Sequence, residues 1–232
     1  MSLVSRGVYR LFLRKSFFTN PCFHYFRFLF NQLTFFGQYY NNLVPGHKKI
    51  DTPASFKATF VLRLGRAKEY RTRSNTEAIR EGEEVPDTPG YVWDTYSPTP
   101  VMSTYLLAWM VSKYESAKST SARGVKFEAF YANASLMQRS ADVAAKMLEH
   151  YEQNVFGINY NLPKMDIVAV RSYEGGAMEN QGMMTFTRSI VVNSGDSGNE
   201  NDEMESAPLS DTFEDDGIMA HELVFRFLTD LT

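Results

Sequence analysis

The sequence predicts an α+β fold in which a strand-rich region precedes a region of mixed helices and strands. Residues 56–64 alternate apolar and polar side chains with a period of two, as in a half-buried strand. Residues 144–155 and 218–228 instead carry apolar side chains at helical spacing. The chain has 232 residues, 44% of them hydrophobic, which is enough to bury one large core or two smaller ones.

The strand-rich region is expected to form a mostly antiparallel β domain. Residues 74–100 are polar and rich in Pro, Gly and Glu, which predicts loops with short connecting strands. Residues 102–111 are nearly all apolar on both faces, which suits a central strand. The side chains predicted to face the core from the first and last strands are Phe56, Ala58, Phe60, Leu62 and Leu64, then Val125, Phe127, Ala129 and Tyr131.

The following region is expected to begin with a helix. Ser135 and Gln138 have the spacing of a capping box, and Gly157 can supply a left-handed stop. We interpret the stripe between them as core, and it consists of Ala144, Met147, Leu148, Tyr151 and Val155. Residues 165–170 and 183–192 are predicted to be strands.

A second helix is predicted near the C-terminal end of the sequence. Residues 195–216 contain nine acidic residues and no basic ones, which usually indicates a solvated loop. Asp211 and Glu214 form a second plausible capping pair. The helix that they would start carries Ile218, His221, Glu222, Phe225 and Leu228.

Residues 1–50 form an atypical basic and aromatic segment. They contain seven Lys or Arg residues and no acidic residue, whereas the remainder of the chain has a net charge of −10. A targeting presequence, a poorly formed secretory signal and non-native sequence from a gene-model error all fit this composition. No apolar run reaches 18 residues, so we expect no transmembrane helix. The only cysteine is Cys22, so no intrachain disulfide can form, which fits either a reducing compartment or a fragment. The spacing of Cys22 from His24 and His47 fits no common zinc pattern.

The residues His221-Glu222 have the form of half a zinc-hydrolase motif. In the complete motif, two histidines at i and i+4 of a helix bind the metal, and the Glu after the first one activates a metal-bound water. Here the first His and the Glu are present, but Phe225 occupies the second position. Taken alone, the pair is better explained as a surface pair near the start of a helix.

A second motif lies about forty residues upstream. Gly176-Ala177-Met178-Glu179-Asn180 resembles the exopeptidase signature of the gluzincin aminopeptidases, the aminopeptidase N-like family of zinc enzymes. The resemblance covers residues 51–232 and includes three further stretches, which are Thr52–Phe60, Pro100–Ala108 and Phe156–Asp166. It does not cover residues 1–50. The alternative for the five residues is a tight glycine turn with an exposed Glu and Asn.

The resemblance implies a fold and a domain organisation. Residues 51–132 would be the C-terminal part of a β-sandwich or saddle-shaped N-terminal domain. Residues 133–232 would be the start of a thermolysin-like catalytic domain, truncated at Thr232. Family members are cytoplasmic or membrane-anchored ectoenzymes, so the compartment stays open.

The resemblance also implies roles for individual residues. His221 would be a zinc ligand, and Glu222 would be the catalytic residue that activates water. Glu179 would pair with the terminal ammonium of a peptide, which explains a preference for free N-termini. The signature as a whole, Gly176, Ala177, Met178, Glu179 and Asn180, would bind the substrate on an edge strand, where small residues allow close backbone approach.

The sequence departs from the family at the metal site. Phe225 stands where the second His belongs, the third ligand would lie beyond Thr232, and Thr52 interrupts the family's Asp-Glu-Pro segment. A catalytic zinc normally needs three protein ligands, so we predict no tight zinc binding and no peptide hydrolysis by this chain as written.

Three hypotheses fit these residues. The chain represents a zinc aminopeptidase that removes N-terminal residues from peptides, or a catalytically dead relative that binds peptides or a partner, or the product of a broken locus. A partner chain is expected to cover the truncated helix face, because Ile218, Phe225 and Leu228 would otherwise be exposed. Nucleic acid is not an expected partner, because residues 51–232 are acidic and lack a recognition motif.

Overall fold

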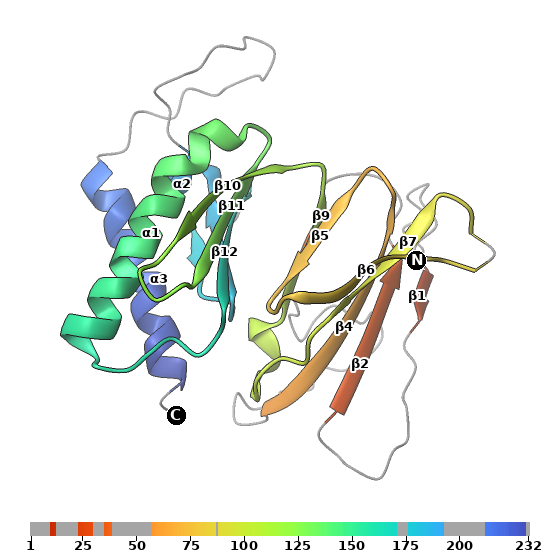
Figure 1. Cartoon of the computed structure of the whole chain (residues 1–232), viewed down its shortest axis with the longest axis horizontal. Helices are drawn as coiled ribbons and strands as arrows, with labels where there is room; N and C mark the ends of the chain where they lie inside the picture. Colours follow the sequence, from red (N-terminus) through yellow and green to blue (C-terminus); the bar gives the residue numbers. More distant parts are fainter. Residues whose placement is uncertain are drawn as a thin grey trace, which may run out of the picture. The chain divides into compact units, whose positions relative to one another are not determined.

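The computed structural model describes residues 10–12, 23–29, 35–38, 57–86, 88–170, 176–192 and 212–230. These residues divide into two compact units, Met1–Lys113 and Tyr114–Thr232. The first unit contains strands and one short 3-10 helix, and the second combines a sheet with helices, so the predicted α+β class is confirmed (Figure 1).

Unit 1 contains two sheets. The larger sheet has the strand order β1-β2-β4-β7-β6, with β8 paired to β4, and the smaller has the order β3-β9-β5. The pairings are antiparallel except that β2 runs parallel to β4. The elements are β1 (Arg10–Phe12), β2 (Phe23–Leu29), β3 (Phe35–Gln38), β4 (Lys57–Ala67), β5 (Arg71–Ser74), β6 (Ala78–Glu84), β7 (Tyr91–Tyr96), β8 (Met102–Ser103), the 3-10 helix η1 (Thr104–Leu106) and β9 (Ala108–Ser112).

Strand β4 follows the predicted alternation, since Phe60, Leu62 and Leu64 are all buried. The prediction of one strand over residues 102–111 is wrong, because η1 interrupts it and separates β8 from β9. The apolar character of that stretch reflects burial of every residue of β9, the middle strand of its sheet.

Unit 2 is built on a mixed sheet with the order β10-β11-β12-β14-β13. The pairs β11–β12 and β12–β14 are parallel, and the two outer pairs are antiparallel. The strands are β10 (Glu115–Thr120), β11 (Lys126–Tyr131), β12 (Lys164–Val170), β13 (Ala177–Met178) and β14 (Met183–Thr187). Strand β11 was predicted to belong to the antiparallel domain that ends at residue 132. It instead pairs in parallel with β12 and lies in unit 2, which begins at Tyr114.

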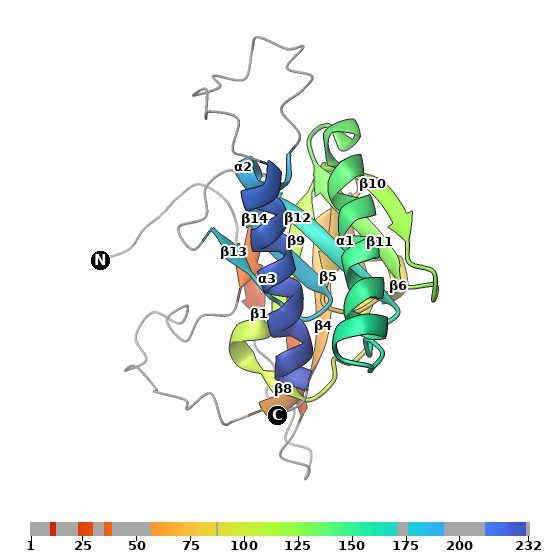
Figure 2. The ribbon, with the colours of Figure 1, turned by 90° about the vertical axis from the view of Figure 1, so that its left-hand side faces the viewer.

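Two helices lie side by side on one face of this sheet (Figure 2). Helix α1 (Gln138–His150) follows the 3-10 helix η2 (Ala134–Met137) and continues into a π-helical turn, η3 (Tyr151–Val155). The predicted Ser135–Gln138 capping box does not form. Asn133 caps η2 instead, because its side-chain oxygen accepts from the backbone N of Ser135, while Gln138 donates to the carbonyl of Lys118.

The end of the first helical segment agrees with the prediction, since Gly157 has a positive φ of 67°. The predicted strand over residues 183–192 is too long. It ends at Thr187, and the short helix α2 (Arg188–Val191) follows, in which Val191 is buried. A strand and a single helical turn both bury apolar residues, so a short apolar run does not distinguish the two.

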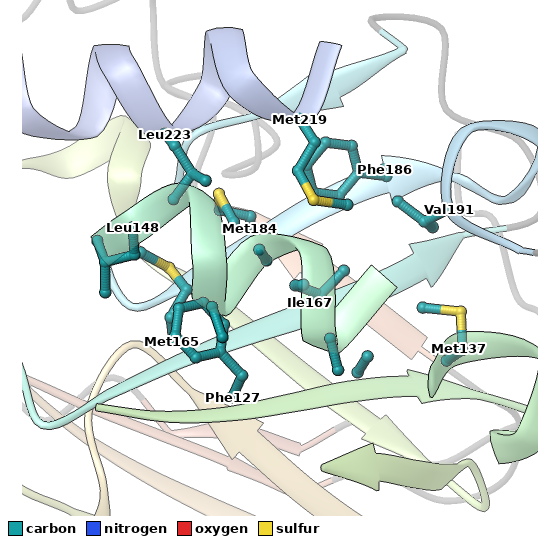
Figure 3. Packing of buried hydrophobic residues seen from close by; sticks show 14 of the residues in the cluster. Phe127, Met137, Leu148, Met165, Ile167, Met184, Phe186, Val191, Met219 and Leu223 are labelled. Carbon is teal, nitrogen blue, oxygen red and sulfur yellow. The ribbon is translucent and has the colours of Figure 1, made fainter. Parts of the chain in front are cut away.

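Helix α3 (Thr212–Asp230) is the second predicted helix. Met219 and Leu223 point from it into the hydrophobic core of unit 2, which also contains Phe186 and Leu148 (Figure 3). Asp211 and most of the acidic loop lie outside the described residues, as do the side chains of Glu214 and Leu228.

Candidate functional site

The signature residues lie at the edge of the sheet in unit 2. Strand β13 is the outermost strand and contains only Ala177 and Met178, which pair with Phe186 and Thr185 of β14. Just before it, the carbonyl of Gly176 accepts a hydrogen bond of 2.7 Å from the backbone N of Thr187. Gly176 has a φ of 74°, which favours glycine at this position.

A tight turn follows β13 and leads into β14. The backbone N of Met183 donates to the carbonyl of Asn180 at 3.1 Å, and Gly182 has a φ of 70°, as the third position of a type II turn requires. The buried Asn180 also donates from its side chain to the hydroxyl of Thr185 at 3.3 Å. Asn180 therefore supports the turn, and Glu179 is the residue between this turn and β13.

Helix α3 is held in place next to the signature by polar and apolar contacts. Arg139 of α1 makes two hydrogen bonds, of 2.8 and 2.7 Å, to the carboxylate of Asp216. The hydroxyl of Tyr151 donates to the carbonyl of Ala220 at 3.3 Å, directly before His221. Together with buried Met219, these contacts fix the segment that carries His221 and Glu222.

Glu179 and Glu222 interact across the space between β13 and α3. The residue Glu222 is only 7% exposed, and burial raises the pKa of its carboxyl to about 7. Repulsion from the negative charge of Glu179 adds to this increase. Strand β13 and α3 are in contact, so two motifs that lie about forty residues apart in the sequence meet in the fold.

The aromatic side chain of Phe225 lies against His221. Their ring centroids are 4.5 Å apart, and the planes are tilted by 48°. His221 is exposed, and Phe225 is 42% exposed. A partner chain was expected to cover this helix face because Phe225 would otherwise be exposed. Phe225 is exposed, but the partner chain stays a prediction.

The donor set around His221 does not fit a catalytic zinc ion. Phe225 offers no atom that can bind a metal at the i+4 position. Within the described part of the chain, no group of three or more His, Cys, Asp or Glu side chains is arranged to hold a metal ion. His221 and Glu222 are therefore present without the second ligand that would complete the helix motif.

Several predicted features cannot be placed. The Thr52–Phe56 stretch, Cys22 and His47 lie outside the described residues, and so does the side chain of His24. The sequence interpretation missed Arg139 and Asp216, which position α3, and it assigned Tyr151 to the core without its hydrogen bond to Ala220. Their partners are far away along the chain, and no local pattern marked them.

The second half of the chain matches a known family. Residues 139–231, which carry both motifs, match the peptidase family M1 domain. This part of the chain is similar to peptidase family M1. The M1 match begins at the start of α1 and includes β12, the signature, β14 and α3.

Named M1 relatives are aminopeptidases. Endoplasmic reticulum aminopeptidase 1 of Homo sapiens is 34% identical over 144 residues, which are 61% of this chain and 15% of the relative. Endoplasmic reticulum aminopeptidase 2 of Bos taurus is 29% identical over 178 residues, 76% of this chain and 17% of the relative. Glutamyl aminopeptidase of Bos taurus is 29% identical over 195 residues, 78% of this chain and 19% of the relative. The chain thus spans less than a fifth of the length of these relatives.

No transmembrane helix was expected for the basic segment. Across the residues that the structure describes, no helix combines the length and the apolar character needed to cross a membrane.

Proposed function

We propose that this chain is an aminopeptidase-like M1 protein that binds the free N-terminus of peptides through Glu179 and, with Phe225 at the metal-ligand position, does not hydrolyse them. The single observation that carries the proposal is the contact between the edge strand β13, which Glu179 directly follows, and helix α3, which carries Glu222. The signature and the His221-Glu222 motif would thus each contribute a carboxylate to the same site.

The arrangement suits a terminal ammonium group. Two carboxylates that repel each other, one of them largely buried, are stabilised when a cation binds between or beside them. A charge-assisted hydrogen bond from an ammonium to Glu179 would supply this stabilisation. An acetylated N-terminus has no charge, so it gains nothing from the pair, and the site would discriminate between the two peptides.

The edge position of β13 suits an extended peptide backbone. A peptide can add to the outer side of an edge strand through backbone hydrogen bonds, as in other cases of strand addition. Ala177 carries a side chain that is too small to hinder such an approach. The signature would then orient the peptide while Glu179 selects its terminus.

Hydrolysis is not part of the proposal because of the donor set. The M1 relatives are named aminopeptidases, and removal of N-terminal residues is the activity that the family resemblance implies. In this chain the helix offers His221 and Glu222 but no ligand at Phe225. No step is therefore assigned to a metal ion.

Binding of matched peptides tests the proposal. A short peptide beginning with alanine and carrying a C-terminal fluorophore is compared with its N-acetylated form by fluorescence anisotropy. We expect the free peptide to bind at least about tenfold more tightly, which corresponds to one charge-assisted hydrogen bond. Glu179→Gln should remove the difference, whereas Glu115→Gln, an exposed residue on the opposite edge strand β10, should keep it. Equal binding of both peptides by the wild type would refute the proposal.

A hydrolytic zinc aminopeptidase is the second candidate, and the environment of Glu222 favours it. A carboxyl group with a pKa of about 7 suits a general base that works near neutral pH. Zinc content and turnover of a fluorogenic alanine substrate distinguish the two functions. Stoichiometric zinc with turnover that Glu222→Gln abolishes would establish the hydrolase and overturn the proposal above.

A further inference from the structure

A buried ion pair lies directly behind the turn that follows Glu179. Lys164 and Asp166 are two residues apart on β12, so their side chains lie on the same face of the strand. The Lys164 Nζ is 2.6 Å from the Asp166 Oδ2, and the side chains are 8% and 3% exposed. The other residues of this strand are apolar, and all but the last residue of the strand are buried.

A pair of this kind is not explained by stability alone. Removing two charges from water costs several kcal/mol per ion, and well-packed apolar replacements are often as stable. A buried pair is better explained where it holds a specific conformation, and the hydrogen bonds of Lys164 identify that conformation.

Both residues bind the same backbone carbonyl. The oxygen of Gly182 accepts a hydrogen bond of 2.9 Å from the Lys164 Nζ and one of 3.0 Å from the backbone N of Asp166. Gly182 is the third residue of the turn that Asn180 begins, and Glu179 directly precedes this turn. The ion pair therefore holds the turn that directly follows Glu179.

We propose that Lys164 and Asp166 are positioning residues for Glu179, which make the site selective for a free peptide N-terminus. This inference rests on the proposed function. Strand β13 has only two residues, so its pairing with β14 restrains Glu179 weakly on one side. The ammonium of Lys164 restrains the turn on the other side. Asp166 neutralises that ammonium, so the pair adds no net charge that would repel a cationic peptide terminus.

The test removes both charges together. Lys164→Met combined with Asp166→Asn keeps the side-chain volumes similar and leaves no unpaired buried charge, so the double variant should fold. The matched control is Lys118→Met with Glu128→Gln. It removes an ion pair of 3.4 Å between the neighbouring strands β10 and β11, where Lys118 is 69% exposed.

Two measurements on the full chain are compared. The first is hydrogen exchange at the amide of Met183, which closes the turn, with the amide of Gly124 in the β10–β11 turn as an internal reference. The second is the affinity ratio between free and N-acetylated alanine peptides. In the Lys164/Asp166 double variant we expect Met183 to exchange at least about tenfold faster and the affinity ratio to fall about tenfold, while Gly124 is unchanged. The control pair should change neither measurement.

The outcomes separate this inference from the proposed function. Unchanged exchange at Met183 overturns the positioning role, whatever the peptides do. Faster exchange with an intact affinity ratio also overturns it, because the ordered turn would then not serve Glu179. A wild-type ratio near one refutes the proposed function and with it selectivity as the purpose of the pair, while the exchange data still show whether Lys164 and Asp166 order the turn.

Discussion

The ring of His221 packs on the ring of Phe225, one turn further along α3, at a centroid distance of 4.5 Å. Residues at i and i+4 of a helix share one face, which is why two histidines in this arrangement can bind one metal ion. In this chain the second ring is a hydrocarbon, and it contacts the imidazole where a second ligand would otherwise be available.

Phe225→His is expected to raise the affinity for zinc. The substitution places two imidazoles on one helix face, and each added ligand strengthens binding, so we expect a gain of about tenfold or more over the wild type. Competition with a zinc-sensitive dye measures it. Phe225→Gln, which is polar but a poor zinc ligand, serves as the control, and an equal gain in that variant would contradict the prediction.

Glu222→Gln is expected to stabilise the protein at high pH. The folded pKa of about 7 lies above the ordinary value of 4.5, so the folded state retains a proton that the unfolded chain loses. The stability of the wild type therefore falls as the pH rises from about 4.5 to about 7, and it stays lower above that range. The variant should be about 1–2 kcal/mol more stable than the wild type at pH 8 and similar at pH 4.

Urea unfolding at the two pH values measures this difference. Glu179→Gln provides a matched control, because it removes only the repulsion that Glu179 exerts on Glu222. Without this repulsion, the pKa of Glu222 should be lower than in the wild type but still raised by burial, which is the larger cause. The stability of Glu179→Gln should therefore still fall as the pH rises, but the fall should be smaller and end at a lower pH than in the wild type. A Glu222→Gln variant that is equally stabilised at both pH values would show that packing, not ionisation, is responsible.

Arg139→Met is expected to loosen α3 and to cost about 1 kcal/mol of stability. The two hydrogen bonds to Asp216 have good geometry, but both side chains are partly exposed, at 39% and 28%, so solvent screening limits their contribution. A double-mutant cycle with Asp216→Asn isolates the pair by urea unfolding. A coupling energy near zero would mean that the apolar contacts of Met219 and Leu223 hold the helix alone.

Asp94→Ala is expected to cost about 3–5 kcal/mol, because Asp94 is a buried acceptor with several donors. Its carboxylate accepts from the Nε of Arg66 at 2.5 Å, from the hydroxyl of Thr72 and from the backbone N of Gly82 at 2.9 Å. It thereby joins β4, β5, β6 and β7 in unit 1. Chemical unfolding followed through the tryptophans measures the loss.

The exposed ion pair between Lys68 and Glu84 is the comparison for Asp94. Its side chains are 57% and 69% exposed, so Glu84→Ala should change stability by less than about 1 kcal/mol. Similar losses for the two variants would contradict the importance of the buried network.

Elements with a strong local pattern were predicted from the sequence. Strand β4 was identified because its period of two is regular, and the end near Gly157 because a positive φ favours glycine. The capping box at Ser135 failed because Asn133, two residues earlier, competes for the same backbone N–H. The parallel pairing of β11 was not predictable from its own residues, since a parallel strand requires a partner across a helical connection.

The site was predicted only in part. Its motifs and their order were recognised through the family resemblance. Strand β13 is an edge strand, as that resemblance implies, and it contacts α3. The ion pair of Lys164 and Asp166 left a weak signal, two charges at i and i+2 in an apolar strand. Its binding partner, the carbonyl of Gly182, belongs to a backbone turn whose position depends on the tertiary fold.

The shortness of β13 sets a limit on how peptide length would matter. A strand of two residues offers a docked chain very few main-chain hydrogen bonds, whatever the length of that chain. Most of the binding free energy would then come from the first residue and its ammonium group. A tripeptide and a decapeptide with the same first residues should accordingly bind with nearly equal affinity, and the protein would act as a sensor of chain ends with little regard for the residues further along the peptide.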